Sequence, residues 1–259
     1  MTFSIIISAL GVNLHKINHW ISSEILEKID DFIIVVQDSS GYNQEINNLK
    51  DLGCKVIIDN KLGLSRSRNL GIDACESYFF WILDDDVYTD LSMIDIILKT
   101  ILSHKADIYG FRIAKDKNKN LYKKYSDRKN IDRLHSLKLS SIELVVSNNF
   151  IKNKLIRFNE NFGLGSKYPN CEENLFLLDC FDKGAQIIHI PEIIVIHSNL
   201  GSGYLKIDNN ALIAKGYVCR KLGLIGFFVI LRWYIRIIVK YQKFSSIKYF
   251  IKGYRLRKT

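Results

Sequence analysis

The chain has few residues that would cross-link it or stiffen it locally. It has 259 residues but only 2 prolines and no low-complexity stretch, so a long disordered linker is not expected. Its 5 cysteines are odd in number and form no C-x-x-C pair, which argues against a disulfide framework or a zinc knuckle. The first segment, MTFSIIISAL, has no basic region before its apolar run, so we expect no signal peptide. These features favour a protein of a reducing compartment.

Negative charge is missing from the C-terminal end of the sequence. Residues 209–259 hold 12 of the 37 Lys and Arg and none of the 27 acidic residues. The first 208 residues therefore carry 25 basic against 27 acidic side chains, a net charge of −2. This distribution indicates a near-neutral body with a basic tail. It excludes a uniformly basic nucleic-acid binder, and we expect no nucleic-acid partner.

The basic tail has no uncharged run long enough to cross a bilayer. Its longest such run is the ten residues LGLIGFFVIL, whereas a spanning helix needs about 20. Arg232, Arg236 and Lys240 then recur every four residues, which places them on one face of a helix. We interpret residues 222–259 as a basic amphipathic segment that lies on an anionic membrane surface. The alternative is a C-terminal helix packed on the domain with a solvated basic face.

Short apolar runs alternate with helical patterns in the first hundred residues. This alternation predicts βαβ units, a mostly parallel sheet and a Rossmann-like α/β fold. In such sheets ligands bind beyond the carboxyl ends of the strands. The expected strands are 3–9, 32–37, 55–59 and 78–83, and the expected helices are 20–29, 43–52, 65–75 and 91–104.

The second hundred residues are less regular. A strand-like segment at 106–113 precedes a lysine-rich stretch at 115–129, which we expect to be an exposed excursion. Apolar character resumes at 142–151, and a glycine-punctuated loop at 162–170 leads to a helical pattern that Gly184 would end. Two strand-like pieces, QIIHI and IIVIH, precede the tail.

Three consecutive carboxylates follow an apolar run in FFWILDDD, residues 79–86. A divalent cation would relieve their mutual repulsion, and Mg²⁺ and Mn²⁺ favour such hard oxygen ligands. The alternative is a solvated acidic turn, with Asp90 capping the next helix. In an extended chain Asp84 and Asp86 project to the same side and Asp85 points away.

The stretch GLSRSRNLGIDA, residues 63–74, places Arg66 and Arg68 near a helix N-terminus. Arginines and free backbone N–H groups at such a terminus suit an anion such as a diphosphate. The alternative for each arginine singly is a solvated helix start.

Together these residues resemble the central signature of family-2 glycosyltransferases of the GT-A fold, of the bacterial surface-polysaccharide type. GLSRSRNLGIDACESYFFWILDDD is similar to the helix and strand that end in the family's D-x-D metal motif. IIVVQDSS resembles its nucleotide-binding acidic turn, and RFNENFGLGSKYPNCEENLFLLDC resembles its acceptor-side block. Four blocks occur in the family's order over roughly residues 3 to 200, whereas each block alone would be a weak signal.

The resemblance implies roles for individual residues. Asp38 would contact the uracil of a UDP-sugar, Asp84 the ribose or sugar, and Asp86 and His197 would ligate Mn²⁺ or Mg²⁺ with Asp84. Glu173 would be the catalytic base. The implied donor-binding set also includes Ser8, Arg66, Arg68 and Asp85.

The acceptor side is implied by the same resemblance. Glu172 would orient the acceptor. For both Glu172 and Glu173 the alternative is a favourable interaction of an acid at a helix start with the macrodipole, and we take this as the main role of Glu172. Tyr168 would either stack on a sugar ring or be an ordinary surface tyrosine. The other acceptor-side residues are Asn148, Gly163 and Gly165. For His197 a structural histidine is the alternative to a metal ligand, and His189 is read as structural.

The sequence departs from the family pattern at three positions. Gln37 replaces the first acid of the usual Asp-Asp turn, Glu173 stands where Asp is common, and Cys171 stands where glycine is frequent. The first departure leaves the uracil contact to Asp38. The second lengthens the base by one methylene group.

The resemblance predicts an inverting, metal-dependent hexosyl- or N-acetylhexosaminyltransferase that moves a sugar from UDP to a saccharide or lipid-linked glycan. We expect it on the cytoplasmic face of the cell membrane. The predicted domains are a GT-A unit over 1–208, with a donor half (1–113) and an acceptor half (114–208), and a tail over 209–259. Three alternatives remain: a non-catalytic nucleotide-sugar-binding protein, a phosphatase of the haloacid dehalogenase type, and a sugar-nucleotide pyrophosphorylase. The phosphatase motif normally follows the first strand, and the pyrophosphorylase glycine loop is missing.

Overall fold

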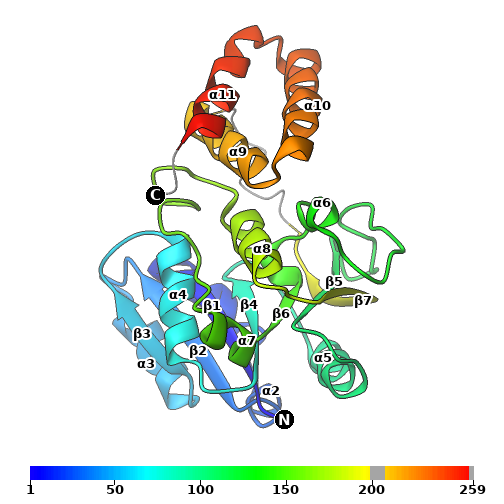
Figure 1. Cartoon of the computed structure of the whole chain (residues 1–259). Coiled ribbons are helices and arrows are strands. Elements are labelled where there is room, and N and C mark those ends of the chain that lie inside the picture. The colour runs from blue at the N-terminus through cyan, green and yellow to red at the C-terminus, as the bar shows by residue number, and fades with distance from the viewer. Residues whose placement is uncertain (199–207, 257–259) are drawn as a thin grey trace.

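A seven-stranded sheet forms the centre of the protein (Figure 1). The computed structural model describes residues 1–198 and 208–256. The strand order is β3-β2-β1-β4-β6-β5-β7. β6 runs antiparallel to β4 and β5, and the other neighbours run parallel. The strands are β1 (Phe3–Leu10), β2 (Asp31–Gln37), β3 (Lys55–Asp59), β4 (Phe79–Asp84), β5 (Ile108–Ala114), β6 (Leu144–Ser147) and β7 (Ile187–Ile196).

Helices cover both faces of the sheet because its central strands are apolar on both sides. Ile5 and Ile7 of β1 belong to one buried cluster, and Ile6 belongs to another. The first cluster is covered by α1 (Leu14–Asn18), α2 (Ser23–Leu26), α3 (Asn43–Asp51) and α5 (Leu91–Ser103). The second is covered by α4 (Leu64–Ala74), α7 (Asn148–Lys154) and α8 (Glu172–Asp182). The short α6 (Arg133–Ser136) lies near α8, and single 3-10 turns are η1 (Gly11–Asn13) and η2 (Ser141–Glu143).

The parallel register brings polar side chains to one edge of the sheet. Ser8 of β1 pairs with Asp84 of β4, and Leu10 pairs with Gln37 of β2. All three strands end here in the same direction, so the residues that follow them share this edge.

The predicted α/β class and mostly parallel sheet are confirmed, and two local expectations are wrong. The region 20–29 forms only the short helix α2, after α1 at 14–18. The two strand-like pieces after residue 185 form one strand, β7, whose register with β5 shifts between Gly110 and Arg112. Pro191 lies within β7 opposite this shift and has no N–H to donate. The apolar run at 142–151 divides into η2, β6 and α7.

The lysine-rich excursion at 115–129 is mostly exposed, as predicted, but one part of it is docked. Lys123 Nζ lies 2.6 Å from Glu143 Oε2, a carboxylate that is fully buried in η2. The Tyr125 hydroxyl accepts a hydrogen bond of 2.8 Å from the Ile113 amide. These contacts hold the segment against the end of β5.

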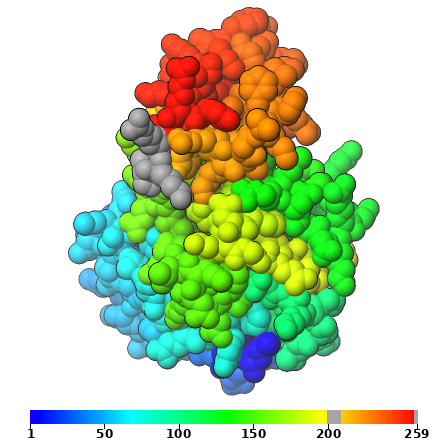
Figure 2. Space-filling model, viewed as in Figure 1, coloured from blue at the N-terminus to red at the C-terminus, as the bar shows by residue number. Residues whose placement is uncertain are grey.

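The C-terminal helices α9 (Asn209–Lys221), α10 (Leu224–Tyr241) and α11 (Ile247–Arg255), with the turn η4 (Phe244–Ser246), form a lobe at one end of the molecule (Figures 1 and 2). α9 and α11 cross closely at Gly216 and Gly253, where a Cβ atom would lie 2.2 Å and 2.0 Å from backbone oxygens of the facing helix. A third buried cluster joins α9 and α10 to α8 and to the loop at 162–171.

The lobe bears on two predictions about the tail. It is helical, as predicted, and α9 packs on the domain. Within residues 1–198 and 208–256 no helix is long and apolar enough to cross a membrane. The division at 208/209 and the two halves of the GT-A unit stay predictions. Residues 199–207 of that unit, and the tail residues Arg257 and Lys258, lie outside the described residues.

Candidate active site

A cavity of about 580 Å³ opens at the carboxyl edge of the sheet. It is lined by the ends of β1, β2 and β4, by the loop after β3, by η2, by the glycine loop and by the start of α8. Of the residues predicted from sequence, the cavity is lined by Ser8, Arg68, Asp84, Asp85, Asp86, Gly165, Glu172, Glu173 and His197. The fold therefore brings together the acidic triplet, Asp84 to Asp86, and the acidic pair, Glu172 and Glu173, which are far apart in sequence.

The three aspartates have three different partners. β4 ends at Asp84, and Asp85 and Asp86 form a turn. The prediction that Asp85 points away is therefore wrong, because the side-chain alternation of a strand does not continue into the turn, and all three residues line the cavity. Asp85 Oδ2 accepts hydrogen bonds from Leu10 N at 2.9 Å and Asn13 Nδ2 at 3.0 Å. Burial raises the pKa of Asp85.

Arg68 connects the acidic triplet to the acidic pair. Its side chain is only 1% exposed, and Nη2 donates to Asp84 Oδ1 at 2.9 Å and to Ser141 Oγ at 2.8 Å. Nη1 donates to Glu172 Oε1 at 3.1 Å. The guanidinium also lies over the ring of Phe158, 5.5 Å from its centroid. Arg68 was predicted to bind an anion at the helix start, but here its charge is matched by two carboxylates of the protein.

The acidic pair begins α8 under unusual backbone geometry. Cys171, the N-cap residue, has φ of +71°, in the left-handed region where glycine is favoured. Glycine would adopt this conformation without the steric cost of a Cβ atom. Glu172 is buried against Arg68, whereas Glu173 keeps part of its surface open toward the cavity. Burial, and then the neighbouring Glu172 carboxylate, raise the pKa of Glu173 to about 8, and Arg68 opposes the rise.

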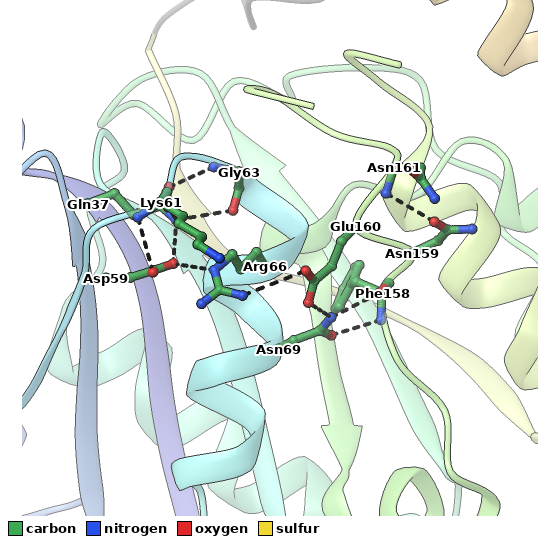
Figure 3. A network of polar contacts seen from close by, with 10 residues as sticks. All are labelled: Gln37, Asp59, Lys61, Gly63, Arg66, Asn69, Phe158, Asn159, Glu160 and Asn161. Carbon is green, nitrogen blue, oxygen red and sulfur yellow. Dashed lines mark hydrogen bonds and ion pairs between the residues drawn. The ribbon is translucent and has the colours of Figure 1, made fainter. Parts of the chain in front are cut away.

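Gln37 belongs to a network that shapes the rim of the cavity (Figure 3). Its Nε2 donates to Asp59 Oδ2 at 3.0 Å and to the carbonyl of Lys61 at 2.6 Å, and its Oε1 accepts from Gly63 N at 3.1 Å. An acid at position 37 could not donate and would face the buried Asp59 carboxylate. The amide is therefore the side chain that this loop requires.

The prediction that Arg66 binds an anionic donor is wrong, because Arg66 belongs to the same network. Its Nε donates to Asp59 Oδ2 at 2.9 Å, and Nη1 lies 3.9 Å from Glu160 Oε2 (Figure 3). Because both carboxylates match its charge and the residue does not line the cavity, Arg66 fastens loop 60–63 and does not face a diphosphate.

Asp86 and His197 form the pair that best fits a divalent cation. His197 Nε2 lies 3.3 Å from Asp86 Oδ1, and this hydrogen bond, opposed by burial, lowers the pKa of Asp86. Both residues line the cavity, and an imidazole nitrogen and a carboxylate oxygen suit Mn²⁺ or Mg²⁺. Within the described residues no three His, Cys, Asp or Glu side chains are grouped closely enough to hold a metal ion. Such a pair fits a cation whose remaining ligands come from a substrate.

Two acceptor-side predictions are wrong. Asn148 is buried and donates to the carbonyls of Cys75 and Ser77, because β6 runs antiparallel and its last residue pairs with Phe79 at the start of β4. This is the opposite edge of the sheet. Tyr168 is only 5% exposed and packs against Phe162, which rules out both a stacking platform and a surface position.

Other predicted residues lie at or near the cavity. Ser8 Oγ and Asn170 Oδ1 are buried at its wall and have no hydrogen-bond partner among the described residues. Gly165 lines the cavity, and Gly163 packs on Ser65 and Glu172 without lining it. Asp38 follows β2, is exposed and does not line the cavity.

Sequence reasoning missed residues that only tertiary contacts bring to the cavity. Tyr122 comes from the lysine-rich excursion and packs edge-on against His197, with ring centroids 5.6 Å apart. Ser141 comes from η2 and holds Arg68. Neither lies in a recognisable motif. His189 is buried, as expected of a structural histidine, and Asp90 caps α5 by accepting from Met93 N at 3.0 Å.

The sheet topology and the acid-lined cavity define an α/β protein with a candidate ligand site at the carboxyl ends of parallel strands. The family model described as "Glycosyl transferase family 2" matches residues 14–161, more than half of the chain. The chain belongs to glycosyl transferase family 2. No curated protein sequence matches it.

Solved structures share the fold. TarS of S. aureus, residues 1–349 in complex with UDP, aligns with a TM-score of 0.70 at 15% identity, covering 98% of this chain and 81% of that one. The complex of the same protein with UDP-GlcNAc has a TM-score of 0.69, 15% identity and the same coverage. Glucosyl-3-phosphoglycerate synthase from Mycobacterium tuberculosis, with Mn²⁺, UDP and phosphoglyceric acid, has a TM-score of 0.56 at 14% identity, covering 85% and 77%.

The GT-A prediction is therefore confirmed, and the protein is a glycosyltransferase by family. The phosphatase and pyrophosphorylase alternatives are wrong, because the chain matches a different family and its acidic motif follows the fourth strand.

Proposed function

We propose that the protein is an inverting, metal-dependent glycosyltransferase. It moves a hexosyl or N-acetylhexosaminyl group from a UDP-sugar to a hydroxyl of a saccharide or lipid-linked glycan in surface-polysaccharide synthesis. One observation carries the proposal: a single cavity is lined by Asp84, Asp86, His197 and Glu173. These are the residue types that a departing diphosphate and an attacking hydroxyl require.

The donor end of the cavity fits a nucleotide diphosphate with a cation. Asp86 and His197 would hold Mn²⁺ or Mg²⁺, which supplies Lewis-acid stabilisation of the charge on the leaving diphosphate. Asp84, fixed by Arg68, is left with its other oxygen for a sugar or ribose hydroxyl. Ser8 Oγ offers a further hydrogen bond at the same wall.

The acceptor end fits a general base. A carboxyl group with a raised pKa accepts a proton from a hydroxyl more readily than an ordinary one, and such a base contributes about 10²- to 10⁴-fold. Glu172 is the weaker candidate, because its side chain is buried and paired with Arg68. With one base and direct displacement, the anomeric centre is inverted.

UDP is the proposed nucleotide because structures with the same fold contain it. The S. aureus TarS structures contain UDP or UDP-GlcNAc, and the M. tuberculosis synthase structures contain UDP with Mn²⁺ or Mg²⁺. These ligands support a UDP-sugar donor for this protein without naming its sugar.

A thermal-shift panel tests the donor and the metal together. The protein is heated with a series of nucleotide sugars, each with and without Mn²⁺. A ligand present at 100 times its Kd adds about 2.7 kcal/mol to the unfolding free energy. We expect one UDP-sugar to raise the melting temperature in the presence of metal only. No response to any nucleotide sugar would contradict the proposal.

Glu173→Gln separates a transferase from a non-catalytic sugar-nucleotide-binding protein. We expect the variant to keep donor-induced stabilisation and to lose UDP release in the presence of acceptor. Unchanged UDP release would remove Glu173 as the base, and no acceptor-dependent release by the wild-type protein would favour the binding protein.

A further inference from the structure

The outer face of α10 carries a row of exposed apolar side chains. We define it as Leu224, Phe228, Leu231, Ile235 and Val239, which follow one another at intervals of three or four residues and so share one side of the helix. Phe228 is 69% exposed and Val239 79% exposed. Exposed apolar residues gathered in this way mark an interaction surface, whereas scattered ones do not.

The opposite side of α10 already provides the packing of this helix. Val229 and Ile230 are buried, and Trp233 and Ile237 pack against the cluster that contains α9. The helix is thus held to the lobe by its inner side, and its outer face contributes nothing to that core.

A row of positive charge runs beside the outer face. Arg232 and Arg236 are exposed, and each directly follows a residue of the outer face, about 100° further around the helix. Lys240 continues the row at the same spacing. Residues 209–259 contain no acidic side chain, so none within that range can neutralise the row.

We propose that the outer face of α10 docks on the surface of an anionic lipid bilayer, with the helix lying in the interfacial plane. The apolar row would enter the boundary between headgroups and acyl chains, and the arginine side chains would extend to lipid phosphates. A second copy of this chain fits less well, because pairing two such faces would bring two basic rows together without acids between them.

The inference uses no residue of the cavity and so does not depend on the proposed function. If both hold, they are connected by packing, since α9 contacts α10 on one side and α8, the helix of Glu172 and Glu173, on the other.

Vesicle co-sedimentation of the full chain tests the proposal. We expect binding to vesicles of phosphatidylcholine with phosphatidylglycerol, little binding to phosphatidylcholine alone, and weaker binding as salt is raised. Arg232→Gln/Arg236→Gln should weaken the binding about 30-fold. This corresponds to about 2 kcal/mol at 1.4 kcal/mol per factor of ten, or about 1 kcal/mol for each basic side chain. Lys50→Gln/Lys154→Gln, which makes the same charge change at exposed positions of α3 and α7, is the matched control and should bind as wild type.

A second pair of variants tests the apolar row. Leu231→Glu/Ile235→Glu should abolish vesicle binding and keep the melting temperature, because both side chains are exposed. Leu102→Glu, at an equally apolar and 73% exposed position of α5, should change neither. If the double variant does not fold, Val239→Glu near the end of α10 serves instead.

Three results would overturn the proposal. They are no binding to anionic vesicles, equal binding to neutral ones, and full binding by Leu231→Glu/Ile235→Glu or its substitute. Concentration-dependent self-association that the double variant abolishes, without vesicle binding, would assign the outer face to a second copy.

Discussion

Removing the Arg68 guanidinium should destabilise the protein more than removing that of Arg66, the other arginine of α4. The side chain is 1% exposed and bridges Asp84 and Glu172 at 2.9 Å and 3.1 Å. Arg68→Met fills a similar volume but leaves Glu172 buried without its positive partner. Breaking a buried ion pair in this way costs about 3–5 kcal/mol. We therefore expect Arg68→Met to lower the free energy of unfolding by about that amount.

Urea unfolding with EDTA measures this loss while preventing any cation from replacing the missing charge at Asp84. Arg66→Met is the matched control on the same helix. Its side chain is 33% exposed, and its partner Asp59 keeps hydrogen bonds from Gln37 and Lys61. We expect a loss of about 1 kcal/mol there, because partly exposed pairs contribute little.

A double-mutant cycle separates the lost charge pair from lost packing. Glu172→Gln in the Arg68→Met background removes the unpaired buried carboxylate and should recover part of the stability. Equal losses for Arg68→Met and Arg66→Met, or no recovery in the double variant, would refute the reasoning.

The remaining predictions concern Glu173, the aspartates of the acidic triplet, and the backbone at Cys171 and Gly216. The folded-state pKa of Glu173 is raised from 4.5 to about 8, so its stabilising effect is complete below about pH 4.5 and is lost as pH rises through 8. Glu173→Gln should therefore flatten the dependence of stability on pH in this range, seen as chemical denaturation at several pH values, and wild-type kcat/KM should rise toward pH 8. Asp86→Ala should abolish metal-dependent turnover, whereas Asp85→Asn should affect it least among the three aspartates; the reverse order in a UDP-release assay would show that the roles are misassigned. Cys171→Gly should lower the melting temperature less than Cys171→Ala, because only glycine relieves the positive φ. Gly216→Ala should lower it by forcing α9 and α11 apart, and an unchanged melting temperature would contradict the close crossing.

Much of the fold follows from local pattern. The runs at 3–9, 32–37, 55–59 and 78–83 are short, β-branched and bounded by turn residues, and such segments become strands buried on both faces. The strand-helix alternation then dictates parallel pairing, which places Asp84, Ser8 and Gln37 at one edge. The acidic triplet was found in this way, because it directly follows an apolar run, whereas Glu172 and Glu173 were named from the family resemblance.

Sequence reasoning failed where the position of a residue depends on the direction of a strand or on contacts between distant segments. Nothing local shows that β6 is antiparallel, yet that direction alone carries Asn148 to the edge opposite the cavity. Asp85 faces the cavity because the strand ends at Asp84 and a turn follows, whereas the alternation assumed an extended chain through Asp86. Tyr168 is buried because the loop at 162–171 forms a core with the C-terminal helices.

The sequence by itself determined the class of the sheet, the positions of its first four strands along the chain, and the residue types that lie at the carboxyl edge. Those depend on periodicity and on the stereochemistry of βαβ units, which act over a few tens of residues. Only the tertiary structure decided the partners of each charge. Arg68 and Glu172 are 104 positions apart, and Asp86 and His197 are 111 apart. Contacts over such separations depend on the packing of distant elements and not on a local sequence pattern. This packing makes Arg68 the link between the two groups of acids and pairs Arg66 with Asp59.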